Sequence, residues 1–432
     1  MRTVDERGEV VVSAGSFTSF GAVDRESTAT AAGPAAGIEV RRATDADVEQ
    51  IVALQVDRNG AEWGPIIRSL VAHPDVGPGC FTVADDGDQV VSSLCLLPAW
   101  LRVGGVDLPV GQPEFVATAA SHGHRGLVRS QMDIVHRWSA ERGDLAQIIT
   151  GIPYFYRRFG YEYAIPFPPI RLVTPGVTMS MPEGWAVRRA RPDDVPAIVR
   201  LHARAQADVP LVATRNEEWW RWWLGVEGPA PTHVAEEDGV VHGVADIGEG
   251  PPGVYDAATT VRAVAYDALD ALDAFLAEAA GRGKSVAIEE RGRHTGPVEA
   301  ISQRHPGHYA LYVRVADPVA LLDRLRTVLS DRLAASPRAG TSGRLVLSTY
   351  TGSIVLTYER GEVISVEAGP PLQDPVGQGG AGVPPDLVAT LLFGRYGATA
   401  LAARHDDVRL GRRADLMETL FPRLDADLAL MQ

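Results

Sequence analysis

Hydrophobic and polar positions change their spacing several times along this chain, which predicts a mixed fold with α+β and α/β character. Residues 1–36 are rich in Ser, Thr, Ala and Gly, and we expect them to form a mobile tail. Beyond this tail, short apolar runs alternate with segments whose apolar residues recur every three or four positions, as in strands followed by amphipathic helices. The clearest of these elements are a strand at 115–118, a helix at 127–142 and a strand at 145–153.

An internal repeat organises the first three quarters of the chain. Residues 37–54 return as residues 184–201, 147 positions later, and ten of the eighteen aligned positions are identical. Each copy has the pattern of a short strand, an Asp-rich helix cap and an amphipathic helix. Because this period is too long for a solenoid, we predict two copies of one domain in tandem, at 37–182 and 183–316.

The last quarter of the chain has a different pattern. It starts with a predicted helix, continues with three alternating segments typical of hairpin strands, and ends with two short helices. The helices are predicted at 319–333, 385–393 and 413–420, and the strands at 344–350, 353–359 and 362–367. We therefore expect an α+β domain over residues 317–432.

The bulk composition excludes several classes of protein. Hydrophobic residues make up 45% of the 432 positions and charged residues 22%, which is ordinary for globular domains. A formal net charge of −14 argues against nucleic acid or an anionic membrane as a partner and suits a cationic substrate. The two cysteines lie in no zinc-binding pattern, so no metal is expected. Since no apolar run resembles a membrane span or a signal peptide, a cytoplasmic location is expected.

Candidate chemistry gathers in the first copy, between the strand at 115–118 and the helix at 127–142. The connecting residues 119–126 are dense in Gly, His and Arg. Free amides at a helix start bind phosphate oxygens, and glycines let the backbone approach a ligand closely. This local basic cluster predicts a pyrophosphate site, although the pattern alone fits a turn kept for packing equally well.

The second copy lacks this feature. Residues 253–263, which we expect to occupy the corresponding place, contain no glycine–arginine loop. The second copy is therefore predicted to be catalytically silent.

Further evidence follows the helix at 127–142. The strand at 145–153 leads into the segment YFYRRFGYEY at 154–163. Together with the loop GHRGLV at 123–128, this segment resembles the GNAT superfamily of N-acetyltransferases. In that superfamily an Arg/Gln-x-x-Gly-x-Gly/Ala loop holds the pyrophosphate of CoA. Here Gly123 and Val128 stand at its first and last positions, which leaves Arg125 or Arg129 to supply the side-chain contact.

The resemblance implies that acetyl-CoA is the acyl donor and that three segments contact it. The strand would pair with the pantetheine arm through its backbone, the loop and helix start would hold the pyrophosphate, and the end of the next strand would line the opposite side. The residues concerned are Phe115, Val116, Ala117 and Thr118 in the strand, Gly123, His124, Arg125, Gly126, Leu127, Val128 and Arg129 in the loop and helix, and Gly151 and Ile152 opposite.

The order of the three domains is similar to that of the enhanced intracellular survival family. In that family a catalytic GNAT domain precedes a degenerate GNAT-like domain and a C-terminal domain that resembles sterol carrier protein. Members acetylate aminoglycosides and lysine side chains. The resemblance thus implies that a primary amine, such as an aminoglycoside, a polyamine or a lysine-like group, attacks the thioester directly. It also implies a homohexamer.

Two candidate bases stay open. In the family a tyrosine protonates the departing thiolate and the terminal carboxylate deprotonates the amine, and the matching residues are Tyr156 and Gln432. Glu114 is an equally supported base, because many N-acetyltransferases carry a glutamate just before this strand. The alternative to an enzyme is a regulatory protein that keeps the GNAT fold and binds CoA or another ligand without turnover.

Overall fold

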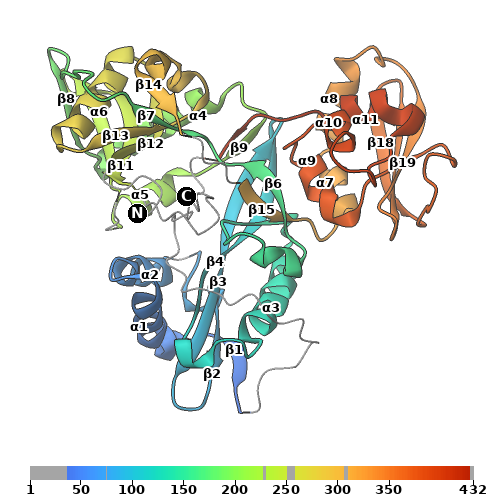
Figure 1. The fold of residues 1–432 in the computed structure, drawn as a ribbon, viewed down its shortest axis with the longest axis horizontal. Helices are drawn as coiled ribbons and strands as arrows, with labels where there is room; N and C mark the ends of the chain where they lie inside the picture. Colours follow the sequence, from blue (N-terminus) through green and yellow to red (C-terminus); the bar gives the residue numbers. More distant parts are fainter. Residues whose placement is uncertain (1–36, 74, 227–229, 251–257, 306–309, 429–432) are drawn as a thin grey trace, which may run out of the picture.

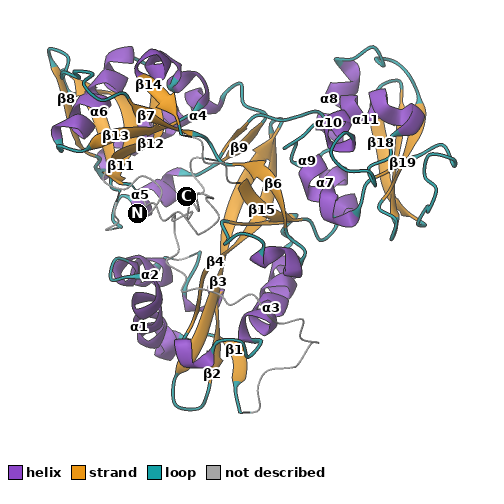
Figure 2. Cartoon of the chain, in the orientation of Figure 1, coloured by secondary structure: helices purple, strands orange, loops and turns teal. Residues whose placement is uncertain are grey.

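The computed structural model describes residues 37–73, 75–226, 230–250, 258–305 and 310–428, which form three lobes (Figure 1). The lobes are built on sheets of nine, seven and four strands, with helices packed against them (Figure 2). The prediction of a mixed fold is therefore confirmed. The tail predicted at 1–36 lies outside the described residues.

The first sheet has the order β1-β2-β3-β4-β5-β15-β6, and β9 and β20 extend it beside β3. Its long hairpin of β3 and β4 turns at Gly104 and Gly105, whose φ angles of 51° and 86° suit a two-residue turn. Helices α1 and α2 pack on one face and α3 on the other (Figure 2). The bounds are β1 Glu39–Arg42, β2 Phe81–Asp85, β3 Val90–Val103, β4 Val106–Thr118, β5 Ala146–Ile149, β6 Glu162–Pro166, β9 Leu211–Ala213, β15 Ala310–Arg314, β20 Ala426–Asp427, α1 Val48–Asn59, α2 Trp63–Ala72 and α3 Leu127–Arg142.

The second sheet repeats this arrangement in the order β14-β7-β13-β12-β11-β10-β8. Helix α4 contributes apolar side chains to a large cluster shared with the other lobes, α6 packs in a second cluster against this sheet, and α5 lies toward the first lobe. The bounds are β7 Ile170–Val173, β8 Trp185–Arg189, β10 Thr232–Glu237, β11 Val240–Glu249, β12 Ala258–Tyr266, β13 Ser285–Glu289, β14 Ser302–Arg304, α4 Val195–Gln206, α5 Glu217–Trp223 and α6 Leu269–Gly281.

These two sheets exchange a strand. β7 lies near the end of the first predicted copy but pairs with β13 and β14 of the second sheet. β15 lies at the end of the second predicted copy but inserts between β5 and β6 of the first sheet. Consequently, neither sheet is complete without a strand from the neighbouring part of the chain.

Side-chain contacts reproduce the internal repeat. Arg41 pairs with Asp47 at 2.8 Å, and Arg188, 147 positions later, pairs with Asp194 at 2.7 Å. Each of these aspartates also accepts a hydrogen bond from the backbone amide three residues before it. The same pair therefore fixes the first strand of each copy to the start of its first helix.

The third sheet has the order β18-β17-β16-β19. Its three hairpin strands occur where the alternating pattern predicts them, whereas the helix predicted at 319–333 is two helices that meet at Leu325. No helix in the described ranges is long and apolar enough to cross a membrane. The bounds are β16 Gly343–Ser348, β17 Ser353–Glu359, β18 Glu362–Gly369, β19 Ala381–Gly382, α7 Pro318–Arg324, α8 Arg326–Ala334, α9 Val388–Leu392, α10 Ala398–Ala402 and α11 Ala414–Leu420.

The last described segment returns from the third lobe to the first two. β20 runs parallel to β9, which pairs with β3 of the first sheet. From β20, Asp427 pairs with Arg291 of the second lobe at 2.8 Å, and the two side chains are 6% and 4% exposed. A second join lies at α5, where the indole of Trp222 donates to the carbonyl of Ser69 at 3.1 Å.

The buried ion pair predicts a selective effect on stability. Removing one partner of such a pair costs about 3–5 kcal/mol, because the other charge stays buried. Asp427→Ala is therefore expected to lower the midpoint of thermal unfolding, and Arg291→Met with Asp427→Leu is expected to recover much of the loss. Asp425→Ala is the control, since Asp425 is 85% exposed. Equal unfolding midpoints for Asp427→Ala and Asp425→Ala would contradict the buried ion pair.

Candidate active site

The central feature of the first lobe is a gap between two parallel strands. β4 pairs with β5 only at Val110 with Ala146 and at Gly111 with Gln147. Beyond these positions β4 continues to Thr118 without further pairing to β5, while β5 pairs along its other edge with β15. The two strands therefore diverge, and the backbone of β4 that faces the gap has no strand partner on that side within the described residues.

A β-bulge interrupts β4 at the gap. The register of β3 with β4 shifts by one residue between Ser93 opposite Ala117 and Cys95 opposite Glu114. Phe115 at the bulge has a φ of 54°, a conformation that residues other than glycine rarely adopt. An extra residue of this kind redirects the neighbouring side chains, so the bulge decides where Glu114 lies.

Glu114 is an unusual carboxylate. Its side chain accepts a hydrogen bond from Gln112 at 3.0 Å, two residues earlier on the same face of β4. Burial raises the pKa of Glu114 to about 7, while the bond from Gln112 acts in the opposite direction. A carboxyl group that titrates near pH 7 is suited to accept a proton from an amine. Gln112 is not among the site residues expected from the sequence. Its position two residues before Glu114 is the signal that places both side chains on one face of the strand.

Tyr156 lies in the short helical turn Phe155–Phe159 after β5, and it is buried at 3% exposure. Burial, and next the charge of Glu114, raise the pKa of its phenol well above the ordinary value. The charge of Glu114 thus acts on the phenol of Tyr156 in the same direction as burial does. The phenol therefore keeps its proton at neutral pH and can donate a hydrogen bond to a leaving thiolate, although the raised pKa makes it a weaker acid.

The exchanged strand β15 holds the segment that carries Tyr156. The phenol oxygen of Tyr312 accepts a hydrogen bond from the backbone of Tyr154 at 2.6 Å, and its hydroxyl donates to the carbonyl of Ile152 at 3.4 Å. Tyr154 has a φ of 67°, so this turn needs an external partner to fix it. Sequence patterns give no signal for Tyr312, because more than 150 residues separate it from the turn.

The loop after β4 presents backbone amides to solvent. Gly123, His124, Arg125 and Gly126 are exposed, and Gly126 caps α3 with a φ of 77°. The first intrahelical bond runs from the amide of Ser130 to the carbonyl of Gly126, which leaves the earlier amides of the helix for an external acceptor. Together with the dipole of a 16-residue helix, these amides suit an anion.

The remaining expected residues have unequal access to a ligand. Val116, Val128 and Ile152 pack in the same hydrophobic cluster as Tyr156, whereas the ring of Phe115 turns toward Trp63 and Phe81. The side chains of Ala117 and Leu127 are buried, and Thr118 bonds to Ser92 at 2.8 Å. Gly151 and Ile152 follow β5, which ends at Ile149 and is shorter than the predicted strand. Gln432 lies outside the described residues.

The second lobe fills the equivalent gap with its own side chain. By strand pairing, Gly111 and Gln147 correspond to Thr259 and Val286, so the position of Ile152 is taken by Arg291. Arg291 donates to the carbonyls of Ala263 and Val264 at 2.8 and 3.2 Å. The β12–α6 connection is only residues 267–268, so it has no room for a counterpart of the loop at 119–126. The segment 253–263, predicted as that counterpart, overlaps β12 instead.

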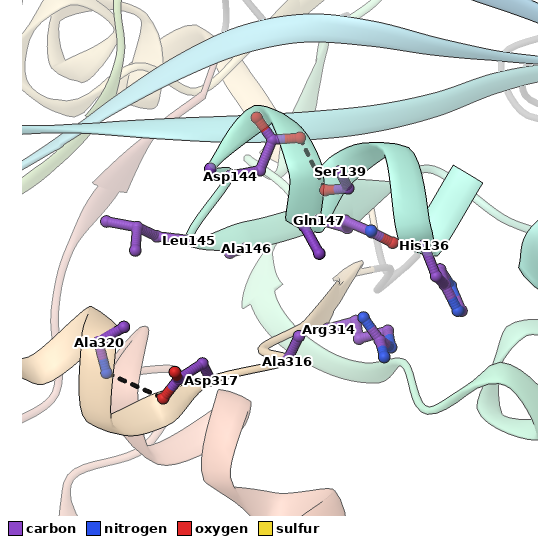
Figure 3. Close-up of a pocket in the computed structure, with 12 residues that line it drawn as sticks. His136, Ser139, Asp144, Leu145, Ala146, Gln147, Arg314, Ala316, Asp317 and Ala320 are labelled. Carbon is purple, nitrogen blue, oxygen red and sulfur yellow. Dashed lines mark hydrogen bonds between the residues drawn. The ribbon is translucent and has the colours of Figure 1, made fainter. Parts of the chain in front are cut away.

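A cavity of about 240 Å³ lies elsewhere, between the end of α3, the start of β5 and the start of α7 (Figure 3). Its walls include His136, Asp144, Gln147, Arg314 and Asp317. None of the residues expected to bind CoA lines it. This cavity is therefore separate from the residues expected to bind acetyl-CoA.

Comparisons with known proteins agree with this geometry. Residues 39–164 match the family model of an acetyltransferase (GNAT) domain. The structure resembles a GCN5-related N-acetyltransferase from Anabaena variabilis with a TM-score of 0.66 at 14% identity, over 90% of this chain and 98% of that chain. It also resembles one from Kribbella flavida (TM-score 0.63, 17% identity, 90% and 97%) and Eis1 from Mycobacterium abscessus (0.58, 15%, 90% and 98%). No curated protein matches the sequence.

The chain thus carries a GNAT acetyltransferase domain. The match spans β1 to β6 and includes the bulge, the gap, the amide loop and Tyr156. The structural neighbours cover 90% of the chain, so they share the fold well beyond this domain. The match to the GNAT domain model supports acetyl transfer in general.

The packing of Tyr156 predicts a strong effect of a small substitution. A methyl group at Gly151 would lie 2.1 Å from Cδ2 of the Tyr156 ring. Overpacking of this kind costs about 1–3 kcal/mol, so Gly151→Ala is expected to lower the unfolding midpoint. Gly281→Ala at the end of α6 meets no atom within 4 Å and is the control. If both variants unfold like the parent, the ring of Tyr156 does not pack as described.

Proposed function

We propose that this protein is an acetyl-CoA-dependent N-acetyltransferase that transfers the acetyl group to a primary amine by direct attack. The proposal is supported by the gap beside the bulge of β4, by the carboxyl group of Glu114 at that bulge, and by the buried phenol of Tyr156, whose pKa the charge of Glu114 helps to raise. Glu114 accepts the amine proton as nitrogen attacks the thioester carbonyl. Tyr156 gives its proton to the sulfur as the carbon–sulfur bond breaks.

Acetyl-CoA is a substrate in this reaction, and its proposed site has two parts. The free edge of β4 from Phe115 to Thr118 pairs with the pantetheine arm as an added strand, and Gly151 and Ile152 face it. The pyrophosphate binds the amides and side chains of residues 123–129. The raised pKa of Glu114 and its place beside the bulge favour it as the base over the terminal carboxylate of Gln432.

The second lobe does not bind acetyl-CoA in this proposal. Arg291 occupies the gap between its strands, and its β12–α6 connection offers no amide loop. The identity of the amine, a C-terminal domain resembling sterol carrier protein, a hexamer, a cytoplasmic location and the absence of metal, nucleic-acid and membrane partners stay predictions.

The first test concerns the acid and the base. Because only the ionised form of Glu114 accepts a proton, kcat/KM for an aminoglycoside or polyamine is expected to rise with pH around a midpoint of about 7. Glu114→Gln is expected to abolish this rise, and Tyr156→Phe to lower kcat roughly 100-fold, with CoA affinity retained. A chain extended beyond Gln432 is the comparison. Loss of activity on extension, with the pH profile of Glu114→Gln unchanged, would assign the base to the terminus.

The second test concerns the pyrophosphate. Each of Arg125→Ala and Arg129→Ala is expected to weaken CoA binding in titration calorimetry by roughly five-fold, equivalent to about 1 kcal/mol for an exposed ionic contact. Neither is expected to change the affinity for pantetheine, which has no pyrophosphate. Arg137→Ala, on an exposed position of the same helix, is the control. A wild-type protein that binds no CoA would reject the proposed function, and binding without turnover on any amine would favour a regulatory protein.

A further inference from the structure

The bulge of β4 needs a partner that holds it. Phe115 adopts a φ of 54°, and this left-handed conformation is strained for a residue with a Cβ atom. An extra residue also leaves part of the ladder unpaired. Such a feature persists only where surrounding contacts fix it. The backbone carbonyl of Phe115 is one group through which a neighbouring side chain can do so.

Gln55 of α1 supplies that partner. Its side-chain amide donates to the carbonyl of Phe115 at 2.6 Å and to the hydroxyl of Ser93 at 2.9 Å. Its carbonyl oxygen accepts from Asn59 at 2.6 Å. Gln55 is fully buried at 0% exposure, which is rare for glutamine, and these bonds compensate for its lost hydration. One side chain therefore joins α1 to both strands at the register shift.

The second lobe preserves this connection with different residues. Ala263 is at its bulge, with a φ of 50°, and His202 stands 147 positions after Gln55 and is also buried. Arg291 donates both to the carbonyl of Ala263 and to Nδ1 of His202, each at 2.8 Å. Both lobes thus tie the bulge carbonyl to the same position of the first helix, directly in one and through an arginine in the other.

The difference between the lobes has a consequence for function. The direct bond from Gln55 requires no side chain in the gap, whereas the indirect bond from His202 places a guanidinium there. Between these two ties, only the second places a charged side chain on the bulge carbonyl from just after the neighbouring strand. We propose that Gln55 is the positioning residue for acyl transfer: its amide holds the bulge so that Glu114 faces the gap. This inference rests on the proposed function.

The test compares Gln55→Leu with Gln131→Leu. Gln131 of α3 is also at 0% exposure, and it accepts from Ser92 and donates to the carbonyl of Thr82 at 2.7 and 3.0 Å. Both variants lose buried hydrogen bonds in the same lobe, so both are expected to lower the unfolding midpoint. Only Gln55→Leu is expected to lower kcat, by roughly 10- to 100-fold as for a misplaced catalytic group, with CoA affinity retained.

A second readout does not depend on turnover. The carboxyl carbon of Glu114 is followed by NMR of protein labelled at glutamate, with Glu114→Gln to identify the signal. Its titration midpoint is expected to move toward the ordinary glutamate value in Gln55→Leu, because a relaxed bulge exposes the carboxylate, and to stay unchanged in Gln131→Leu. Identical titration of Glu114 in the two variants would overturn the positioning role. A wild-type protein that turns over no amine would reject the proposed function separately.

Discussion

The short pairing of β4 with β5 is the constraint on which the rest of the site depends. Two parallel strands that stayed paired along their length would saturate the backbone of β4 and leave no room beside it. Because β4 pairs with β5 only at Val110 and Gly111, β4 keeps a free edge next to Glu114. β15 maintains the divergence, since it takes the far edge of β5 and fixes the turn that carries Tyr156. The second lobe contributes to the first site through this strand.

Duplication has given the two lobes one backbone geometry and two uses. Both keep the ion pair between an arginine of the first strand and an aspartate at the start of the first helix. Both also keep a bulge with a left-handed residue and a connection from the first helix to the bulge carbonyl. In the second lobe Arg291 occupies the position of Ile152 and pairs with Asp427 from the end of the described chain. A gap that could hold a ligand in the first lobe thus serves in the second to attach the C-terminal segment. The same fold changes from a candidate catalytic unit to a structural one by exchange of an apolar side chain for a charged one.

Sequence patterns predict the local features well and the long-range ones poorly. The repeat at 37–54 and 184–201, the hairpin strands of the third sheet, the helix at 127–142 and the loop before it follow from spacing and composition. The exchange of β7 and β15 does not, because strands of four or five residues carry too little pattern to specify a partner more than 100 residues away. Gln55 and Tyr312 look like ordinary helix and strand residues, and their roles depend on contacts that only the fold creates. Glu114 was recognisable from its position, but its raised pKa depends on burial.

The proposed reaction requires an acyl carrier in the gap between β4 and β5, and a crystal structure of the protein with CoA tests this most directly. We expect the pyrophosphate to contact the amides of residues 123–129 and the sulfur to lie between the strands, beside Glu114 and Tyr156. CoA bound in the second lobe, in the cavity at the end of α3, or with its sulfur outside the gap would contradict it.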